Sequence, residues 1–211
     1  MTTGMVEGPS PRITSRGALR RDQILDTAAD MFLALGYEGV SVDEIIRTVG
    51  GSKTNLYRHF GGKEGLFSAV VVQACDAFIG TFATTKMAHL APENGLRLLG
   101  QALLRILLED RHVAFQRLVL AESGRFPAMA RLWFESGPER SRRVIASFLR
   151  GKQAEGALRP GDPDEIAILY HDMIVTNPLY LALLGAKPSW SEIEHSVDVA
   201  VTTLLHGIQR S

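Results

Sequence analysis

The chain has too little cysteine for a disulfide-stabilised fold. Its 211 residues include a single cysteine, so no intrachain disulfide can form and a reducing compartment such as the cytoplasm is expected. Cys75 falls inside a helical pattern, where a small buried apolar residue is its simplest role. A disulfide-rich secreted scaffold is therefore excluded, and the length suits one or two domains with a sizeable core.

Long apolar runs and an excess of charge are also missing. The best candidate for a membrane span, residues 66–82, contains Gln73 and Asp76, and no apolar signal-peptide region follows the N-terminal arginines. We therefore expect no membrane segment. The 23 Lys and Arg residues balance the 23 Asp and Glu residues, but DNA responds to local patches of charge, so a DNA-binding protein is not excluded.

The motifs of catalysis and of metal or cofactor binding are absent from the sequence. The six histidines are scattered, and there is no HExxH motif, no cysteine pair and no Gly-rich loop after a strand. His171 and Asp172 are adjacent and would point to different faces of a helix, so they make a poor catalytic dyad. We predict that the chain is not an enzyme, has no catalytic residues and binds no metal or cofactor.

What the sequence does contain is a pair of short helices between residues 41 and 60. Ser41 and Glu44 have the spacing of a capping box, which predicts the start of the first helix. Gly50 and Gly51 supply the positive φ that a sharp turn requires, and Ser52 caps a second helix. Two helices joined by a Gly-containing turn are typical of the helix-turn-helix motif, whose second helix enters the major groove of DNA.

The second helix carries side chains suited to DNA. Its eight residues span about 12 Å, which matches a major groove about 12 Å wide. Thr54 and Asn55 in its first turn can contact base edges, and donors for phosphate oxygens surround them: Lys53, Tyr57, Arg58, His59 and Lys63. The alternative is a solvated basic face on an ordinary helical hairpin. The clustering of phosphate donors around a polar first turn favours DNA binding.

Many positions in this region match one known family without a gap, over about the first third of the chain. They are Arg21, Ile24, Leu25, Ala28, Ala29, Phe32, Gly36, Tyr37, Ser41, Val42, Ile45, Gly50, Ser52, Lys53, Leu56, Tyr57, His59, Phe60, Lys63, Glu64, Leu66 and Phe67. The stretch resembles the N-terminal signature of the TetR family of bacterial transcriptional regulators. The resemblance implies an all-helical homodimeric repressor that leaves its operator when a small molecule binds the C-terminal domain. One departure is Gly51, which replaces an apolar residue.

The resemblance also implies roles for individual residues. Thr54 and Asn55 match positions that usually face bases, and Lys53, Tyr57, His59 and Lys63 match positions that usually meet the backbone. The predicted DNA-binding residues are Arg16, Ser41, Val42, Ser52, Lys53, Thr54, Asn55, Tyr57, Arg58, His59 and Lys63.

We divide the chain into a disordered basic arm at residues 1–17, a helix-turn-helix domain at 18–67 and a C-terminal helical domain at 68–211. The arm is rich in Gly, Pro, Ser and Thr. It begins a basic run of Arg12, Arg16, Arg20 and Arg21, which suits either a solubilising tail or an arm that reaches the minor groove. In the helix that follows, Ile24, Ala28, Phe32 and Leu35 predict one buried stripe.

The C-terminal domain also has a helical pattern throughout, and no strand alternation of useful length occurs. Helices are expected at about 67–83, 93–109, 113–122 and 127–156, the last with a break at Gly137–Pro138. The segment 115–140 resembles the C-terminal domain of AefR- and AcrR-like members. The predicted fold class is therefore all-α.

The last two helices favour a dimer. Asp162 and Ser189 cap them. The helix after Asp162 is apolar on almost every side and the helix after Ser189 has one apolar stripe, so both must pack against other helices. A two-fold dimer would place two recognition helices on one face of a palindromic operator. The alternative is that both helices pack inside their own domain. The predicted interface comprises Ile166, Leu169, Tyr170, Ile174, Val197, Val201, Leu204 and Leu205.

The effector site is less clearly defined by the sequence. Large or polar residues of the middle helices are the candidates, and His171 and Asn177 are expected to converge in an apolar pocket. These residues could equally be core residues, or in the case of His171 an interface residue. The candidates are Phe115, Leu118, Trp133, Phe134, His171, Met173 and Asn177, which favour a small, mostly apolar effector. A helical ligand-binding protein without DNA binding is the remaining alternative, against which the basic cluster argues.

Overall fold

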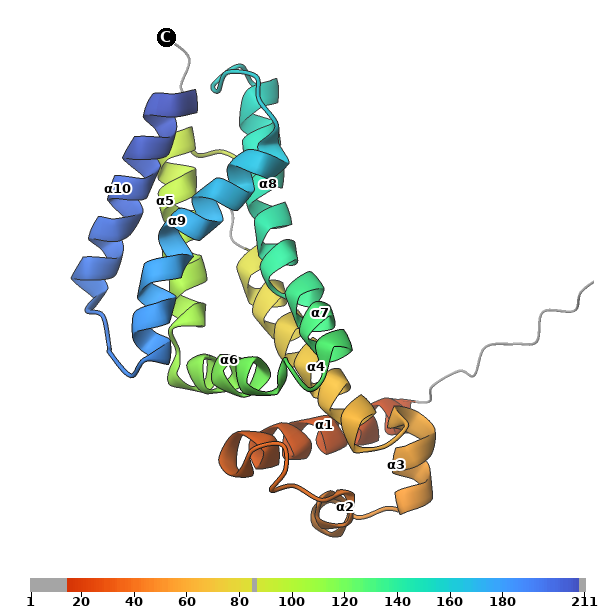
Figure 1. Cartoon of the computed structure of the whole chain (residues 1–211). Coiled ribbons are helices and arrows are strands. Elements are labelled where there is room, and N and C mark those ends of the chain that lie inside the picture. Colours follow the sequence, from red (N-terminus) through yellow and green to blue (C-terminus); the bar gives the residue numbers. More distant parts are fainter. Residues whose placement is uncertain (1–14, 85–86, 209–211) are drawn as a thin grey trace, which may run out of the picture. The chain divides into compact units, whose positions relative to one another are not determined.

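The computed structural model describes residues 15–84 and 87–208, with the side chains of 15–18 and 207–208 left aside. All the elements it assigns within these ranges are helices, so the predicted all-α class is confirmed (Figure 1). They are α1 (Ser15–Leu35), α2 (Val42–Val49), α3 (Lys53–Phe60), α4 (Lys63–Ala83), α5 (Pro92–Leu107), α6 (Asp110–Glu122), α7 (Pro127–Ser136), α8 (Pro138–Ala154), α9 (Pro163–Leu183) and α10 (Trp190–Ile208).

The chain divides into two compact units, Met1–Leu66 and Phe67–Ser211. The break falls inside α4, which is one continuous helix shared by both units. Of the predicted basic arm, residues 1–14 with Arg12 lie outside the described residues, as does the side chain of Arg16. Residues 15–17 form the first turn of α1 rather than part of an arm.

The N-terminal unit is built around the inner face of α1. Ile24, Ala28 and Phe32 are buried there, as their helical spacing predicts, and Leu56 of α3 is also buried. Leu35 is 56% exposed, so the predicted stripe ends at Phe32. The reason is that α1 ends at Leu35 and the chain leaves it through Gly36, which has a φ of 71°.

The core of the C-terminal unit is formed by α4, α5, α8, α9 and α10. The α10 helix packs against both α5 and α9, as Figure 1 shows in blue, yellow-green and light blue. Its apolar stripe is therefore covered within the same chain. The stripe consists of Ile193, Val197, Ala200, Val201, Leu204 and Leu205, each at most 8% exposed.

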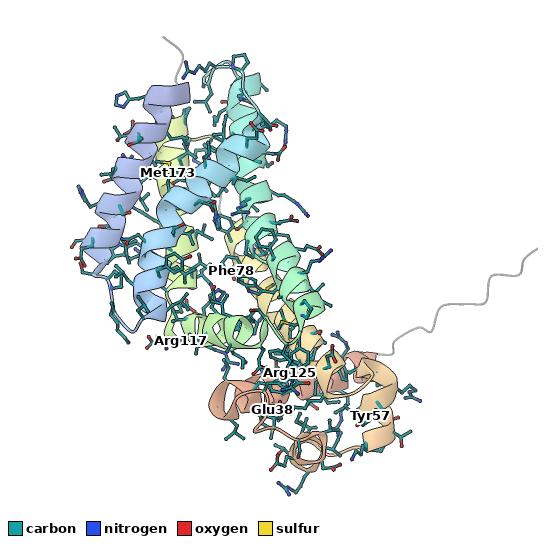
Figure 2. The ribbon with its side chains drawn as sticks, in the orientation of Figure 1. Glu38, Tyr57, Phe78, Arg117, Arg125 and Met173 are labelled. Carbon is teal, nitrogen blue, oxygen red and sulfur yellow. The ribbon has the colours of Figure 1, made fainter. Side chains whose placement is uncertain are left out.

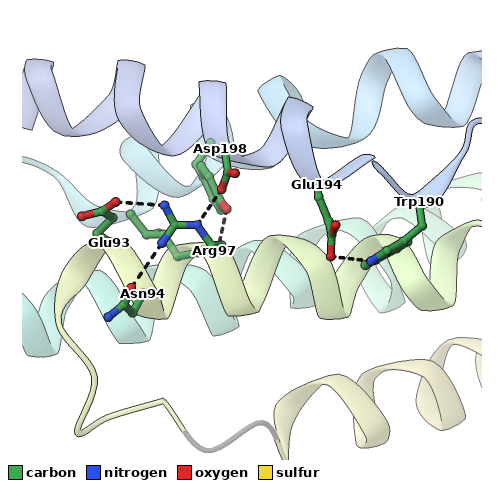
Figure 3. A network of polar contacts seen from close by, with 8 residues as sticks. Glu93, Asn94, Arg97, Trp190, Glu194 and Asp198 are labelled. Carbon is green, nitrogen blue, oxygen red and sulfur yellow. Dashed lines mark hydrogen bonds and ion pairs between the residues drawn. The ribbon is translucent and has the colours of Figure 1, made fainter. Parts of the chain in front are cut away.

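Polar groups join three of these helices (Figure 3). Arg97 on α5 donates from Nε to Oδ1 of Asp198 on α10 at 2.6 Å, and the buried Tyr170 hydroxyl on α9 donates to the Leu96 carbonyl at 2.7 Å. A Cβ at Gly100 would stand 2.6 Å from the Tyr170 hydroxyl oxygen. The close approach of α9 to α5 therefore requires glycine at position 100.

The surface that α9 and α10 offer differs from the predicted dimer interface. Of the eight predicted residues, Leu169 is 60% exposed and Ile166 is partly buried. The other six are buried in their own core because α5, α9 and α10 cover one another: Tyr170, Ile174, Val197, Val201, Leu204 and Leu205. The exposed large apolar residues of α9 and its C-cap are instead Ile168, Leu169, Met173, Tyr180, Leu181 and Leu184. Pairing with a second copy stays a prediction.

Two helices, α4 and α9, are long and apolar enough to cross a membrane by length and composition alone. This is weak support for a membrane span, because the core helices of soluble proteins pass the same test. Both helices contribute buried residues to the core of the C-terminal unit.

Candidate functional site

The first helix of the predicted motif begins with the expected capping box. Ser41 Oγ accepts a hydrogen bond from the Glu44 backbone N–H at 3.1 Å, and Glu44 Oε2 accepts one from the Ser41 backbone N–H at 3.1 Å. The hydrogen bonds from the Ser41 side chain and then its backbone lower the pKa of Glu44. Gly50 and Gly51 follow with φ values of 75° and 107°, so the turn uses backbone angles that favour glycine.

The second helix of the motif is fixed at its start and along its inner face. Ser52 Oγ accepts from the Asn55 backbone N–H at 3.3 Å, and Leu56 and Phe60 are buried. Because that face is anchored, Thr54 and Asn55 are exposed on the first turn, and Tyr57, half exposed, projects from α3 (Figure 2). The side chains predicted to contact bases are thus accessible.

Both lysines that we predict to bind phosphate have partners within the N-terminal unit. Lys53 Nζ donates to Asp43 Oδ2 at 3.0 Å, and this hydrogen bond raises the pKa of Lys53. Lys63 Nζ lies 4.3 Å from the centroid of the Tyr37 ring and 4.0 Å from Glu38 Oε2. A phosphate oxygen of DNA would compete with these partners for each ammonium.

Arg20 is a cation near this surface whose position the sequence did not reveal. Its guanidinium NH2 atom stands 3.2 Å from where a Cβ on Gly50 would lie and 3.3 Å from the same point on Gly51. An apolar side chain at position 51 would therefore crowd Arg20 as well as strain the backbone. Glycine in place of the family's usual apolar residue at position 51 therefore leaves room for the Arg20 guanidinium beside the turn.

A cavity of about 240 Å³ lies within the C-terminal unit, among side chains of α4 to α9. Its aromatic lining comprises Phe78, Trp133 and Phe134, and its polar lining comprises His112, Gln116, Ser141, Arg142 and His171. The His112 ring lies 5.4 Å from the Phe78 ring between centroids. A small, mostly apolar cavity with a few polar groups is typical of a ligand site.

The titratable groups of the cavity, apart from the arginine, are uncharged near neutral pH. Burial lowers the pKa of His112 to about 4 and raises the pKa of the Cys75 thiol to about 12. Burial also lowers the pKa of His171, against the hydrogen bond from its Nδ1 to Asp172 Oδ1 at 2.9 Å. The guanidinium of Arg142 is therefore the remaining cation among the described lining residues.

Two family profiles match the chain. The profile described as "bacterial regulatory proteins, tetR family" matches residues 24–70, and the "AefR-like transcriptional repressor, C-terminal domain" matches residues 94–207. The chain belongs to the TetR family of transcriptional regulators. Members of the TetR family are DNA-binding proteins rather than enzymes, which agrees with the non-enzymatic prediction.

Solved structures and curated relatives agree with this assignment. A TetR-family regulator from Mesorhizobium loti is 29% identical with a TM-score of 0.85, covering 93% of this chain and 100% of that one. The flavonoid-responsive regulator FrrA is 31% identical with a TM-score of 0.79, covering 91% and 98%. The repressor Rv1474c of Mycobacterium tuberculosis is 26% identical over 81% of this chain and 86% of its own. The repressor AcnR of Corynebacterium diphtheriae is 38% identical, but over only 37% of each chain.

Most, though not all, of the residues predicted to bind DNA are exposed in the structure. Val42 is only 8% exposed and belongs to the core of the N-terminal unit, so it is not available to DNA. Ser41 and Ser52 are exposed but serve as caps. Arg58 and His59 are exposed on α3. The DNA contacts themselves stay predictions.

The cavity of the C-terminal unit is lined by three of the seven predicted effector residues, Trp133, Phe134 and His171. Met173, which Figure 2 labels on α9, and Asn177 are exposed, because positions two and six residues from His171 face the other side of a helix. Val175 and Leu179, four and eight residues on, line the cavity instead. Phe115 and Leu118 do not line it.

Sequence reasoning missed the polar residues that complete the cavity. His112 and Gln116 stand four residues apart on α6, a spacing that could have been noticed as one face of that helix. Arg142 gave no such signal, because it is one of three basic residues between 140 and 143 and its neighbour Arg143 is exposed.

Proposed function

We propose that the chain is a homodimeric transcriptional repressor that leaves a palindromic operator when a small, mostly apolar effector binds. The observation that carries the proposal is the exposure of Thr54 and Asn55 on the first turn of α3, beside Lys53 and Arg58. Short polar side chains can distinguish base edges, whereas cations mainly position the protein on phosphates. The TetR-family profile that matches residues 24–70 supports this reading of α3.

A second copy of the chain is the partner that the outer face of α9 suits best. Leu169, Met173 and Tyr180 form an exposed apolar row on that helix, and Leu184 at its end is 85% exposed. An apolar row of this kind marks an interaction site, and a two-fold pairing would present two α3 helices to one operator. The functional state is then a cytoplasmic dimer without a membrane contact.

The cavity of the C-terminal unit is the effector site in this proposal. Its aromatic walls favour a planar, mostly apolar molecule. FrrA, whose name describes it as flavonoid-responsive, is 31% identical over 91% of this chain, which supports an aromatic effector. The α4 helix lines the cavity with Phe78 and reaches Lys63 in the N-terminal unit, so it offers a continuous path for the signal.

Gel retardation with the DNA upstream of the chain's own coding region tests the proposal. We expect a retarded complex whose affinity falls steeply with salt concentration, and its loss when an aromatic effector is added. An Asn55→Ala and Thr54→Ala double variant should lose the complex with this DNA, whereas a Thr203→Ala variant on exposed α10 surface should keep it. Retardation that the double variant leaves unchanged would contradict the role of α3.

A further inference from the structure

Two polar side chains on the cavity wall make no hydrogen bond. Gln116 and His112 both line the cavity from α6, and no hydrogen bond from the described residues reaches either side chain. Burial alone lowers the pKa of His112, so neither a charge nor a hydrogen bond acts on its ring. Buried polar groups are nearly always hydrogen-bonded. These two side chains therefore need a partner that the described chain does not supply.

The amide of Gln116 faces the cavity rather than the packed interior. Among the described residues, Arg142 Nε is the buried side-chain nitrogen or oxygen that has neither a hydrogen bond nor room for a water molecule beside it. The amide atoms of Gln116 also lack a hydrogen bond, but they are not sealed in this way, so they border open space. Gln116 is only 4% exposed and lines the cavity, so the cavity is the open space that its amide borders.

The chemistry of the amide decides which group of a ligand fits. A glutamine side chain carries a donor and an acceptor side by side, and it pairs through both with a ring edge that offers an acceptor and a donor, as glutamine does with adenine. His112 lies one helical turn away on the same face of α6, and its neutral ring adds one donor and one acceptor. A ligand that offers acceptors alone leaves half of the amide unpaired.

The size and walls of the cavity set the rest of the ligand. At about 240 Å³ it is larger than an apolar cavity of about 150 Å³ that holds benzene and smaller than most drug-binding sites. Phe78, Trp133, Phe134 and His112 contribute flat ring surfaces. One or two fused aromatic rings are therefore the expected body of the ligand.

We propose that Gln116 is the specificity-determining residue of the cavity and that its amide pairs, through Nε2 and Oε1 together, with a planar aromatic ligand that carries an N–H beside a carbonyl. The inference rests on the proposed function in taking the cavity as the effector site. It adds a selection rule: aromatic lactams bind in preference to isomers in which the N–H is blocked.

Two isomers test this rule without DNA. 4-Methyl-2-quinolinone keeps its ring N–H beside the carbonyl, whereas 1-methyl-2-quinolinone has the same composition but carries the methyl group on that nitrogen. Equilibrium dialysis of the full chain at pH 7.5 measures both affinities. We expect the 4-methyl isomer to bind at least about tenfold more tightly, because the 1-methyl isomer leaves Gln116 Oε1 unpaired. Equal affinities, the opposite preference, or no binding of either isomer would overturn the proposal.

A Gln116→Met variant tests whether the amide is the group that recognises the ligand. Methionine is a similarly long, unbranched side chain without the amide donor and acceptor. The preference should therefore fall to within about threefold, through weaker binding of the 4-methyl isomer alone. Gln101→Met, at a partly buried position on α5 outside the cavity lining, should keep the full preference. A preference that survives in Gln116→Met, or an equal loss of both affinities, refutes the assignment.

The stability of the same variant separates a binding role from a structural one. Because the amide makes no hydrogen bond within the described chain, Gln116→Met should leave the urea midpoint of the ligand-free protein unchanged or raise it. A lowered midpoint would show that the amide stabilises the fold, and it would contradict the assignment.

The outcome is separable from that of the proposed function. Release of DNA by 4-methyl-2-quinolinone is measured in the gel-retardation experiment and not by dialysis. If this isomer binds with the expected Gln116 dependence but leaves the DNA complex intact, the selection rule stands and the effector role fails. If the chain retards no DNA at all, the proposed function fails whatever the dialysis shows.

Discussion

In the N-terminal unit most of the side chains that we assign to DNA are exposed, whereas in the C-terminal unit the side chains that line the cavity are mostly buried or partly buried. Thr54 and Asn55 stand on a helix whose inner face alone, through Leu56 and Phe60, holds the fold. His112 and His171 instead lie within the packed helices. Substitutions of the proposed DNA-contacting residues should therefore leave the stability of the first unit unchanged. Substitutions of the cavity residues in the second unit should change both ligand binding and stability.

The largest expected effect is on the stability of the C-terminal unit. Tyr170→Ala removes a fully buried ring and its hydrogen bond to Leu96, so we expect a loss of roughly 4 kcal/mol in the free energy of unfolding. Tryptophan fluorescence during urea unfolding measures it, because Trp133 and Trp190, the two tryptophans of the chain, lie in this unit.

Tyr170→Phe is the matched control for that substitution. It keeps the ring and removes the hydroxyl, so a loss of about 1 kcal/mol is expected. Equal losses in the two variants would mean that the hydrogen bond rather than the packing of the ring stabilises α9 against α5.

The second largest expected effect is the loss of stability at low pH that follows from the buried His112. Burial lowers its pKa to about 4 from 6.5, so between these pH values the unfolded chain binds a proton that the folded chain does not. Stability is thus lost as the pH falls from about 6.5 to about 4, by a total on the order of 3 kcal/mol. His112→Phe removes this contribution, and urea midpoints at pH 7 and pH 4.5 should then differ less than in the wild type. The same pH slope in both proteins would argue against a buried neutral imidazole.

The smallest effect concerns the N-terminal unit alone. Ser41→Ala removes the side-chain acceptor of the capping box on α2, which should destabilise that helix by about 1 kcal/mol. Amide hydrogen exchange should become faster in residues 42–49, while the unfolding followed by the two tryptophans stays the same. Slower folding or a shifted midpoint of the C-terminal unit would show that the two units are not independent in this respect.

The difference between the units also explains how much the sequence could predict. Ser41, Ser52, Asp162 and Ser189 each cap the helix they were expected to begin, because capping depends on residues two or three positions apart. The helix boundaries near Gly137 followed from proline and glycine in the same way. These are local rules.

What the sequence could not predict depends on packing between helices. The stripe of α10 is apolar whether it faces a second copy or its own core, and only the positions of α5 and α9 show that the core covers Val197 and Val201. The cavity likewise draws on six consecutive helices, α4 to α9, with lining residues spread from Cys75 to Leu179. Arg142 is distinguished from Arg143 by its surroundings and not by its residue type.

The central claim is that α3 recognises DNA through its first turn, and its most direct test is a comparison of two variants on matched and mismatched operator DNA. Asn55→Ala should reduce the ratio of affinities for the two DNAs by about 5-fold to 150-fold, because a base contact is worth roughly 1–3 kcal/mol. Lys53→Ala, which also frees Asp43, should weaken both complexes alike and lower the salt dependence by about one phosphate contact. If both variants change the affinity ratio to the same extent, or neither changes any affinity, the assignment of α3 is contradicted.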